Sequence, residues 1–258
     1  MQMMKTLLMG AGAVGAASVA LVAVPDHDAE KSANASSAES EICLKGDLEL
    51  FEGVSSKCFS RDELLALRDR PVVDMQGQPV AVSMSHPTDM SMPAEDCRTC
   101  RDYSEMSFDG WYALSSREMR REAYFVRACG ILAALANAQP AGATYFSNGS
   151  PEAEEVALFA GTMKFGEAGP SEDIHVEKTP GAIWRISSGD MNWLIHEIAN
   201  ADFDNDGVEE IMIFTAGAPE GGTASFYSAG LLEKDTAGAA LSFTPVSYGR
   251  DKAAGAGL

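Results

Sequence analysis

Acidic side chains are concentrated around Gly207. The stretch reads DFDNDGVEE, so three aspartates occupy alternate positions just before Gly207. Alternate carboxylates converge on one point only if the backbone turns tightly, and glycine permits the positive φ that such a turn needs. Carboxylate and carbonyl oxygens are the ligands that a hard cation such as Ca²⁺ prefers. The expected calcium ligands are Asp202, Asp204, Asp206, Val208 through its carbonyl oxygen, and Glu210.

The residues on either side of this loop distinguish it from an EF-hand. An EF-hand has a bidentate acid at loop position 12 and a helix on each side. Position 12 is Ile213 here, and the flanking stretches 193–198 and 211–214 are rich in large apolar residues that indicate strands. A strand, an acidic loop whose last acid is at position 9, and a second strand resemble the calcium loop of FG-GAP and VCBS-type repeats.

The resemblance covers about 25 residues around 195–216 and implies that the same five residues hold the ion. Glu210 stands where the repeat pattern has aspartate, and the chain contains no second copy of the loop. Because propellers need repeats at a fixed period of about 40 residues or more, we do not expect a propeller. The alternative interpretation is a plain acidic turn, since Asp and Gly favour turns without any ion. A bound ion is expected to be structural rather than catalytic.

Cysteine usage predicts disulfide bonds. The chain has five cysteines, which in an exported protein pair by default. Spacing does not fix the connectivity. The pairing we expect is Cys43–Cys58 and Cys97–Cys100, with Cys129 as a buried apolar residue on a helix.

A second chemistry is suggested by residues 84–100. Cys97 and Cys100 have the spacing of a redox dithiol, and several methionines accompany His86 in the preceding segment. Thiol, thioether and imidazole groups are ligands that Cu(I) selects. A thioredoxin-like site needs a strand directly before the motif, and residues 91–96 do not indicate one. A periplasmic redox or copper-handling protein is therefore the alternative hypothesis.

The two ends of the chain have the composition of non-core segments. Residues 1–24 combine Lys5 with an apolar run, which is typical of a signal peptide, or alternatively of an N-terminal membrane anchor. Residues 25–41 are polar and predict a flexible linker, and residues 251–258 predict a disordered tail. We therefore expect an exported protein, either periplasmic or secreted, with membrane anchoring through residues 1–24 as the alternative.

Between these ends, helix signals come before strand signals. Capping boxes at Ser60–Glu63 and Ser115–Glu118 predict two helices, the second over about 116–138, and a short helix is expected from Pro151 to about 160. Residues 83–110 are expected to form a long loop. The expected strands are 183–187, 192–199, 209–215, 223–232 and 241–247.

This order predicts an α+β fold, with an N-terminal helical part followed by a C-terminal antiparallel sheet. The acidic loop would form the tip of a hairpin over 192–215. Residues 42–250 are expected to form a single domain, with a sub-boundary near 140–180 as the alternative.

Charge and the absence of common motifs limit the function. The formal net charge of −19 disfavours nucleic acid and anionic membranes as partners, and is compatible with a cation, a protein or a small-molecule ligand. The chain contains no nucleophile elbow, phosphate loop or HExxH motif, so no catalytic residue is assigned. We expect a binding or structural module with one structural Ca²⁺ loop rather than an enzyme. A hydrolase whose site is not recognisable from sequence is a further alternative.

Overall fold

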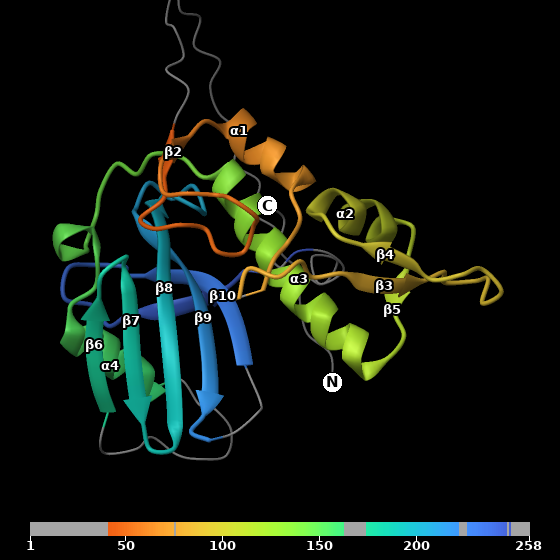
Figure 1. The fold of residues 1–258 in the computed structure, drawn as a ribbon. Helices are drawn as coiled ribbons and strands as arrows, with labels where there is room; N and C mark the ends of the chain where they lie inside the picture. Colours follow the sequence, from red (N-terminus) through yellow and green to blue (C-terminus); the bar gives the residue numbers. More distant parts are fainter. Residues whose placement is uncertain (1–40, 75, 163–173, 222–225, 247, 249–258) are drawn as a thin grey trace, which may run out of the picture. The chain divides into compact units, whose positions relative to one another are not determined.

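A computed structural model describes residues 41–74, 76–162, 174–221, 226–246 and 248 (Figure 1). The expected signal or anchor segment, the linker up to residue 40 and the C-terminal tail lie outside the described residues. Within the described part, no helix is both long and apolar enough to cross a membrane.

A six-stranded antiparallel sheet contains most of the C-terminal part of the fold. Strands that follow one another in the chain are neighbours in the sheet, so the topology is a meander with β8 and β9 at its centre. Across the sheet, the strands are β11 (Ser242–Pro245), β10 (Phe226–Glu233), β9 (Glu210–Pro219), β8 (Met191–Ala201), β7 (Ile183–Ser188) and β6 (Ile174–Thr179). The mixed α+β class is thus confirmed, and β6 is a strand that the sequence did not predict.

Short strands and helices alternate in the N-terminal part, so helices do not simply precede strands. β1 (Ile42–Cys43) pairs with β2 (Cys58–Phe59), and a three-stranded sheet contains β4, β3 and β5 in that order. Its strands are β3 (Val82–Ser85), β4 (Glu95–Cys97) and β5 (Tyr112–Ala113). The helices are α1 (Arg61–Ala66), α2 (Cys100–Phe108), α3 (Ser116–Asn137) and, after a 3₁₀ turn at Ser147–Gly149, α4 (Ala153–Thr162). A further 3₁₀ turn, Leu67–Asp69, follows α1.

The expectation of a long loop over 83–110 is wrong, because this range contains β3, β4 and α2. Helix α2 begins with a capping box that was not predicted from the sequence. The Thr99 hydroxyl accepts a hydrogen bond from the backbone N–H of Asp102, and the Asp102 carboxylate accepts one from the N–H of Thr99. Aspartate at the third helical position thus does what glutamate or glutamine usually does.

One of the two predicted capping boxes is complete and the other is not. Ser60 and Glu63 make both reciprocal hydrogen bonds at the start of α1. At the start of α3, Ser115 accepts from the N–H of Glu118, but the Glu118 carboxylate accepts from the N–H of Ser83 on β3, at 2.9 Å. The long helix is therefore joined to the small sheet at this point.

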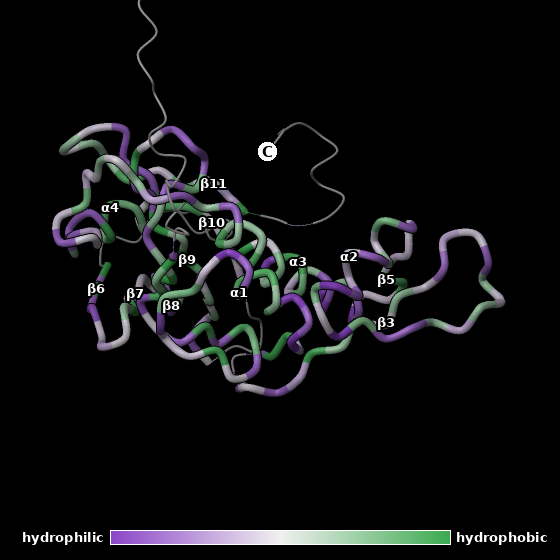
Figure 2. The backbone as a smooth tube through the Cα atoms, turned by 90° about the horizontal axis from the view of Figure 1, so that it is seen from above, coloured by the Kyte–Doolittle hydropathy of each residue, from purple (hydrophilic) through white to green (hydrophobic). Residues whose placement is uncertain are grey.

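The large sheet is packed on both faces. Helix α4 and Phe146 cover one face with a core that includes Trp184 and Ile195, and in Figure 1 this helix lies behind β6 and β7. Helix α3 and the N-terminal segment cover part of the opposite face with a larger core that includes Phe125 and Phe214. Figure 2 shows hydrophobic stretches, in green, along α3 and α4.

The two disulfides are only partly those expected. Cys43–Cys58 links β1 to β2 as predicted. The second disulfide joins Cys100 to Cys129, with Cα atoms 5.5 Å apart, so the predicted Cys97–Cys100 pair and the unpaired Cys129 are both wrong. Cys100 begins α2 and meets α3, whereas Cys97 is buried as a free thiol that donates to the carbonyl of Thr99. Desolvation by burial raises the pKa of the Cys97 thiol to about 12.

Thiol titration tests this pairing. In the native, unreduced protein we expect no thiol to react with Ellman's reagent, because Cys97 is inaccessible and protonated. In guanidinium chloride one thiol should react, and Cys97→Ser should remove it; after reduction all five should react. Three reactive thiols in the denatured, unreduced protein would contradict the assignment.

Glu197 on β8 is a buried charge that connects three parts of the chain. Its carboxylate accepts hydrogen bonds from Lys45, from Ser150 and from the Trp184 indole. Burial alone would raise the pKa of Glu197, but these hydrogen bonds and the Lys45 charge outweigh it, so the pKa lies below its ordinary value. The N-terminal segment is thereby fixed to the sheet.

Glu197→Gln should destabilise the protein by about 2–4 kcal/mol, since it leaves the ammonium group of Lys45 without its charged partner. Urea unfolding at pH 7 measures this, with the exposed Glu220→Gln as control. A loss no larger than that of the control would show that the network contributes little.

Candidate metal site

The five expected ligands lie at one end of the β8–β9 hairpin. β8 ends at Ala201 and β9 begins at Glu210, so residues 202–209 form the connection. Phe203 is 6% exposed and inserts into the larger core, while Asp204 and Asp206 are exposed. The buried phenylalanine fixes one side of the loop and leaves the acidic side facing outward.

The structure brings four of the expected side chains together. One carboxylate oxygen from each lies within 4.8 Å of the others. Two of these side chains are buried and two are exposed, so the group extends from the protein interior to the surface. The four are Asp202, Asp204, Asp206 and Glu210.

Backbone N–H groups of the loop hold these carboxylates in place. The Asp202 carboxylate accepts from the N–H of Asn205 at 2.7 Å and from that of Gly207 at 3.0 Å. Gly207 has φ +88°, which is the positive φ that the sequence predicted for this glycine. The N–H of Val208 donates to the Asp206 carboxylate at 2.7 Å. The loop therefore curls around its own acidic groups.

A second segment, residues 139–143, packs along the loop and was not anticipated from the sequence. Gln139 and Asp202 exchange two backbone hydrogen bonds, and the N–H groups of Gly142 and Ala143 both donate to the Gly207 carbonyl. No acidic or apolar pattern distinguishes this segment in the sequence.

Ala143 and Val208 form a β-bridge whose hydrogen bonds do not involve the Val208 carbonyl. Ala143 donates to the carbonyl of Gly207 and accepts from the N–H of Glu209, the residues before and after Val208. The bridge thus fixes the backbone at Val208 without using the oxygen that the sequence assigns to the ion.

Glu210 has a strongly shifted pKa. Its pKa is raised to about 7, chiefly by desolvation on burial and also by the charges of Asp204, Asp206 and Asp202, while a hydrogen bond from the N–H of Phe203 acts in the opposite direction. Near neutral pH this carboxyl is therefore only partly ionised. A nearby positive charge would favour its ionised form. A group of this kind could hold a metal ion.

The alternative copper or redox residues are not brought together. Cys97 is buried and Cys100 is in a disulfide, so they do not form a dithiol. Met84 is fully buried in the core, whereas Met90 and Met92 are exposed.

His86 has a local structural role at the same place. Its Nδ1 accepts a hydrogen bond from the N–H of Asp89 at 3.0 Å, and its ring packs edge-on against Trp111. These contacts order the turn that follows β3. They account for the histidine without any ion.

Comparisons with known proteins do not assign the site. No protein-family model, no curated protein and no solved structure matches the chain. The likeness to FG-GAP and VCBS-type loops therefore depends on the loop residues alone, and any function of the chain depends on the chemistry of its own site.

The pKa of Glu210 predicts how stability depends on pH in metal-free protein. Because the folded pKa lies above the ordinary value of 4.5, the contribution is complete below pH 4.5 and is lost as pH rises through about 7. Unfolding in EDTA should show a loss of up to about 3 kcal/mol between pH 5 and pH 8. Glu210→Gln should remove this component, and an unchanged pH profile in the variant would contradict the assignment.

Proposed function

We propose that the loop binds one Ca²⁺ ion through Asp202, Asp204, Asp206, the Val208 carbonyl and Glu210, and that the ion stabilises an exported binding or structural module. Four carboxylates within 4.8 Å of one another support this function most directly. Among the described residues, no lysine or arginine forms an ion pair with any of the four. A cation from solvent is the natural source of the missing positive charge.

The chemistry of the donors favours calcium over other metals. All five proposed donors are oxygens, and Ca²⁺ accepts six to eight oxygen ligands in flexible arrangements. Zn²⁺ selects cysteine and histidine, which the group lacks. Mg²⁺ demands near-octahedral geometry and keeps several waters, which suits a dense cluster of carboxylates less well.

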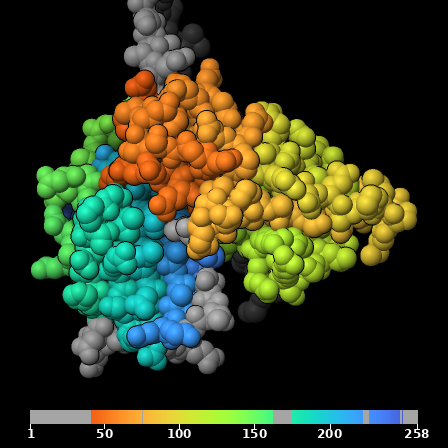
Figure 3. All heavy atoms as spheres, in the orientation of Figure 1, coloured from red at the N-terminus to blue at the C-terminus, as the bar shows by residue number. Residues whose placement is uncertain are grey.

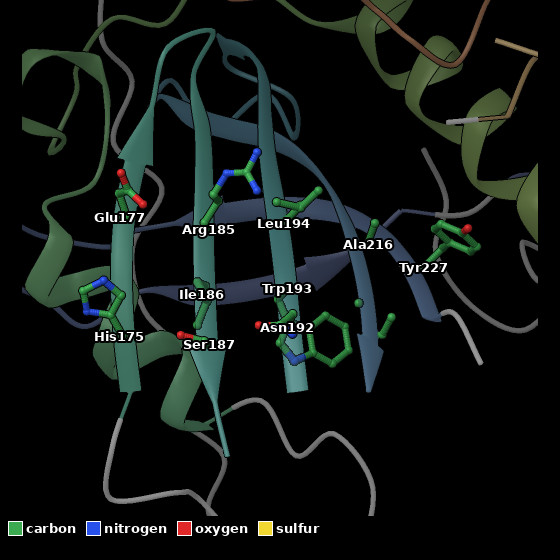
Figure 4. A pocket seen from close by; sticks show the side chains of 12 residues that line it. His175, Glu177, Arg185, Ile186, Ser187, Asn192, Trp193, Leu194, Ala216 and Tyr227 are labelled. Carbon is green, nitrogen blue, oxygen red and sulfur yellow. The ribbon is translucent and has the colours of Figure 1, made fainter. Parts of the chain in front are cut away.

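A structural role is supported by what surrounds the ion site. The loop joins the two central strands and is hydrogen-bonded to the segment that follows α3, so an ion there would hold three parts of the fold together. A surface hollow on the large sheet lies at the ends of β8 and β9 that are remote from the loop (Figure 4). An ion in the loop would therefore be far from a molecule bound in that hollow.

Export fits both the disulfides and the ion. Two disulfides are typical of a protein that folds in an oxidising compartment. If the Kd is about 10⁻⁵ M and free Ca²⁺ is about 10⁻³ M, mass action stabilises the folded state by roughly 2.7 kcal/mol. Folding would then be coupled to the external calcium concentration.

Thermal unfolding with 1 mM Ca²⁺ and with EDTA tests the proposal. We expect calcium to raise the Tm by about 5–10 °C, which is the shift that such a free energy produces in a domain of this size. Mg²⁺ at the same concentration should raise it by less. Equal melting temperatures in calcium and EDTA would refute the proposal.

Two variants separate ion binding from a merely acidic turn. Asp204→Asn keeps an oxygen that can accept from the N–H of Asp206, yet it should lose most of the calcium response. Glu210→Gln should have two opposite effects at pH 8. It should stabilise the metal-free protein, because a buried negative charge is removed, and it should reduce the stabilisation by calcium.

Asp235→Asn is the matched control, since Asp235 is an exposed acid in a different turn. It should keep the full calcium response. If Asp204→Asn and Glu210→Gln respond to calcium as the wild type and this control do, the loop is an acidic turn and nothing more.

A further inference from the structure

A hollow of about 520 Å³ lies on the face of the large sheet opposite α4. Its volume is in the range of small-molecule sites, about 300–1,000 Å³. Helix α3 covers this face as far as Tyr227, whose ring lies 5.4 Å from that of Tyr124. Beyond Tyr227 the sheet is not covered by the described N-terminal part, as Figure 3 shows for the surface of β6–β8 below the orange segment.

The strand register places one row of side chains across the hollow. In antiparallel strands, residues directly opposite one another project from the same face. Apolar and aromatic groups occupy the β8–β10 end of the row, and two charged groups occupy the β6–β7 end. The row contains Glu177, Arg185, Leu194, Ala216 and Tyr227.

The neighbouring row on the same face adds further polar groups. His175 on β6 and Asn192 on β8 both line the hollow and are exposed. On β9 the floor is formed by Ala216 and Ala218, whose small side chains leave the space that larger residues would fill. The hollow therefore has an apolar floor with polar groups at its margin (Figure 4).

Glu177 and Arg185 are opposite charges at directly opposed positions, yet they do not pair. Neither forms an ion pair with a residue in the described part of the chain. Figure 4 shows the Arg185 guanidinium extending from β7 towards β8, away from Glu177. Both charged side chains are exposed and line the hollow, so both remain available to a ligand that lies over the sheet.

We propose that this hollow binds a free amino acid with an apolar side chain. A guanidinium binds a carboxylate through two parallel hydrogen bonds, and Glu177 supplies an acceptor for an ammonium group. Leu194, Ala216 and Tyr227 offer apolar surface to the side chain. Glu177 and a net charge of −19 disfavour polyanionic ligands. The binding site is independent of the calcium loop.

Isothermal titration with each of the twenty protein amino acids at about 10 mM tests the proposal. We expect L-leucine, L-phenylalanine or another apolar amino acid to bind in calcium and in EDTA alike at a temperature where both forms are folded. For L-phenylalanine as probe, 3-phenylpropionate and phenethylamine each lack one charged group and should bind at least tenfold more weakly. Equal binding of all three compounds would contradict recognition of both charges.

Variants connect the binding to the hollow. Arg185→Gln and Glu177→Gln change exposed side chains. Each should lower the affinity for the amino acid found to bind by at least tenfold, with unchanged melting temperature. Arg61→Gln, an exposed arginine on α1, is the matched control and should bind as the wild type does. The proposal is overturned if no amino acid binds, or if Arg185→Gln binds as tightly as the wild type. A missing calcium response together with retained amino-acid binding would refute only the metal site.

Discussion

Mutual repulsion among four carboxylates at the turn between β8 and β9 is the constraint on which the rest of the fold depends. These strands are the two central strands of the sheet, and both hydrophobic cores pack against them. They meet at the turn, where Asp202 and Glu210 are buried. The loop keeps this arrangement through backbone N–H groups that partly compensate the negative charge, and through a raised pKa at Glu210. A bound cation would complete that compensation.

Other strong interactions connect the surrounding segments to the same strands. Lys45 and Glu197 join the N-terminal segment to β8, and Lys234 at the end of β10 pairs with Glu155 on α4. The Cys100–Cys129 disulfide joins α2 to α3, which itself packs against β10. The central hairpin is therefore held on both faces, while its acidic end lies at the surface. Stabilising that end is the simplest role that the geometry allows for an ion.

The sequence predicted features that depend on local chemistry. The acidic loop, the complete capping box at Ser60 and the long helix α3 each follow from residues close together in the chain. The Cys97–Cys100 prediction is wrong because cysteines close in sequence need not have side chains that meet, and the start of α2 turns Cys100 towards α3.

Long-range contacts were beyond the reach of sequence patterns. The hydrogen bond from Ser83 to Glu118 and the segment 139–143 along the acidic loop join residues far apart in the chain. β6 was missed because it is an edge strand with charged residues at exposed positions, which do not form a buried apolar run. The hollow was missed for a similar reason, since it arises from the register of five strands.

A crystal structure of the protein grown in millimolar calcium would show directly whether the loop between β8 and β9 holds an ion. We expect one calcium peak in the loop, with oxygens of Asp202, Asp204, Asp206, Val208 and Glu210 about 2.3–2.6 Å from it. Anomalous scattering would identify the ion. A well-ordered loop whose carboxylates keep their backbone hydrogen bonds and surround no ion would contradict the proposed calcium site.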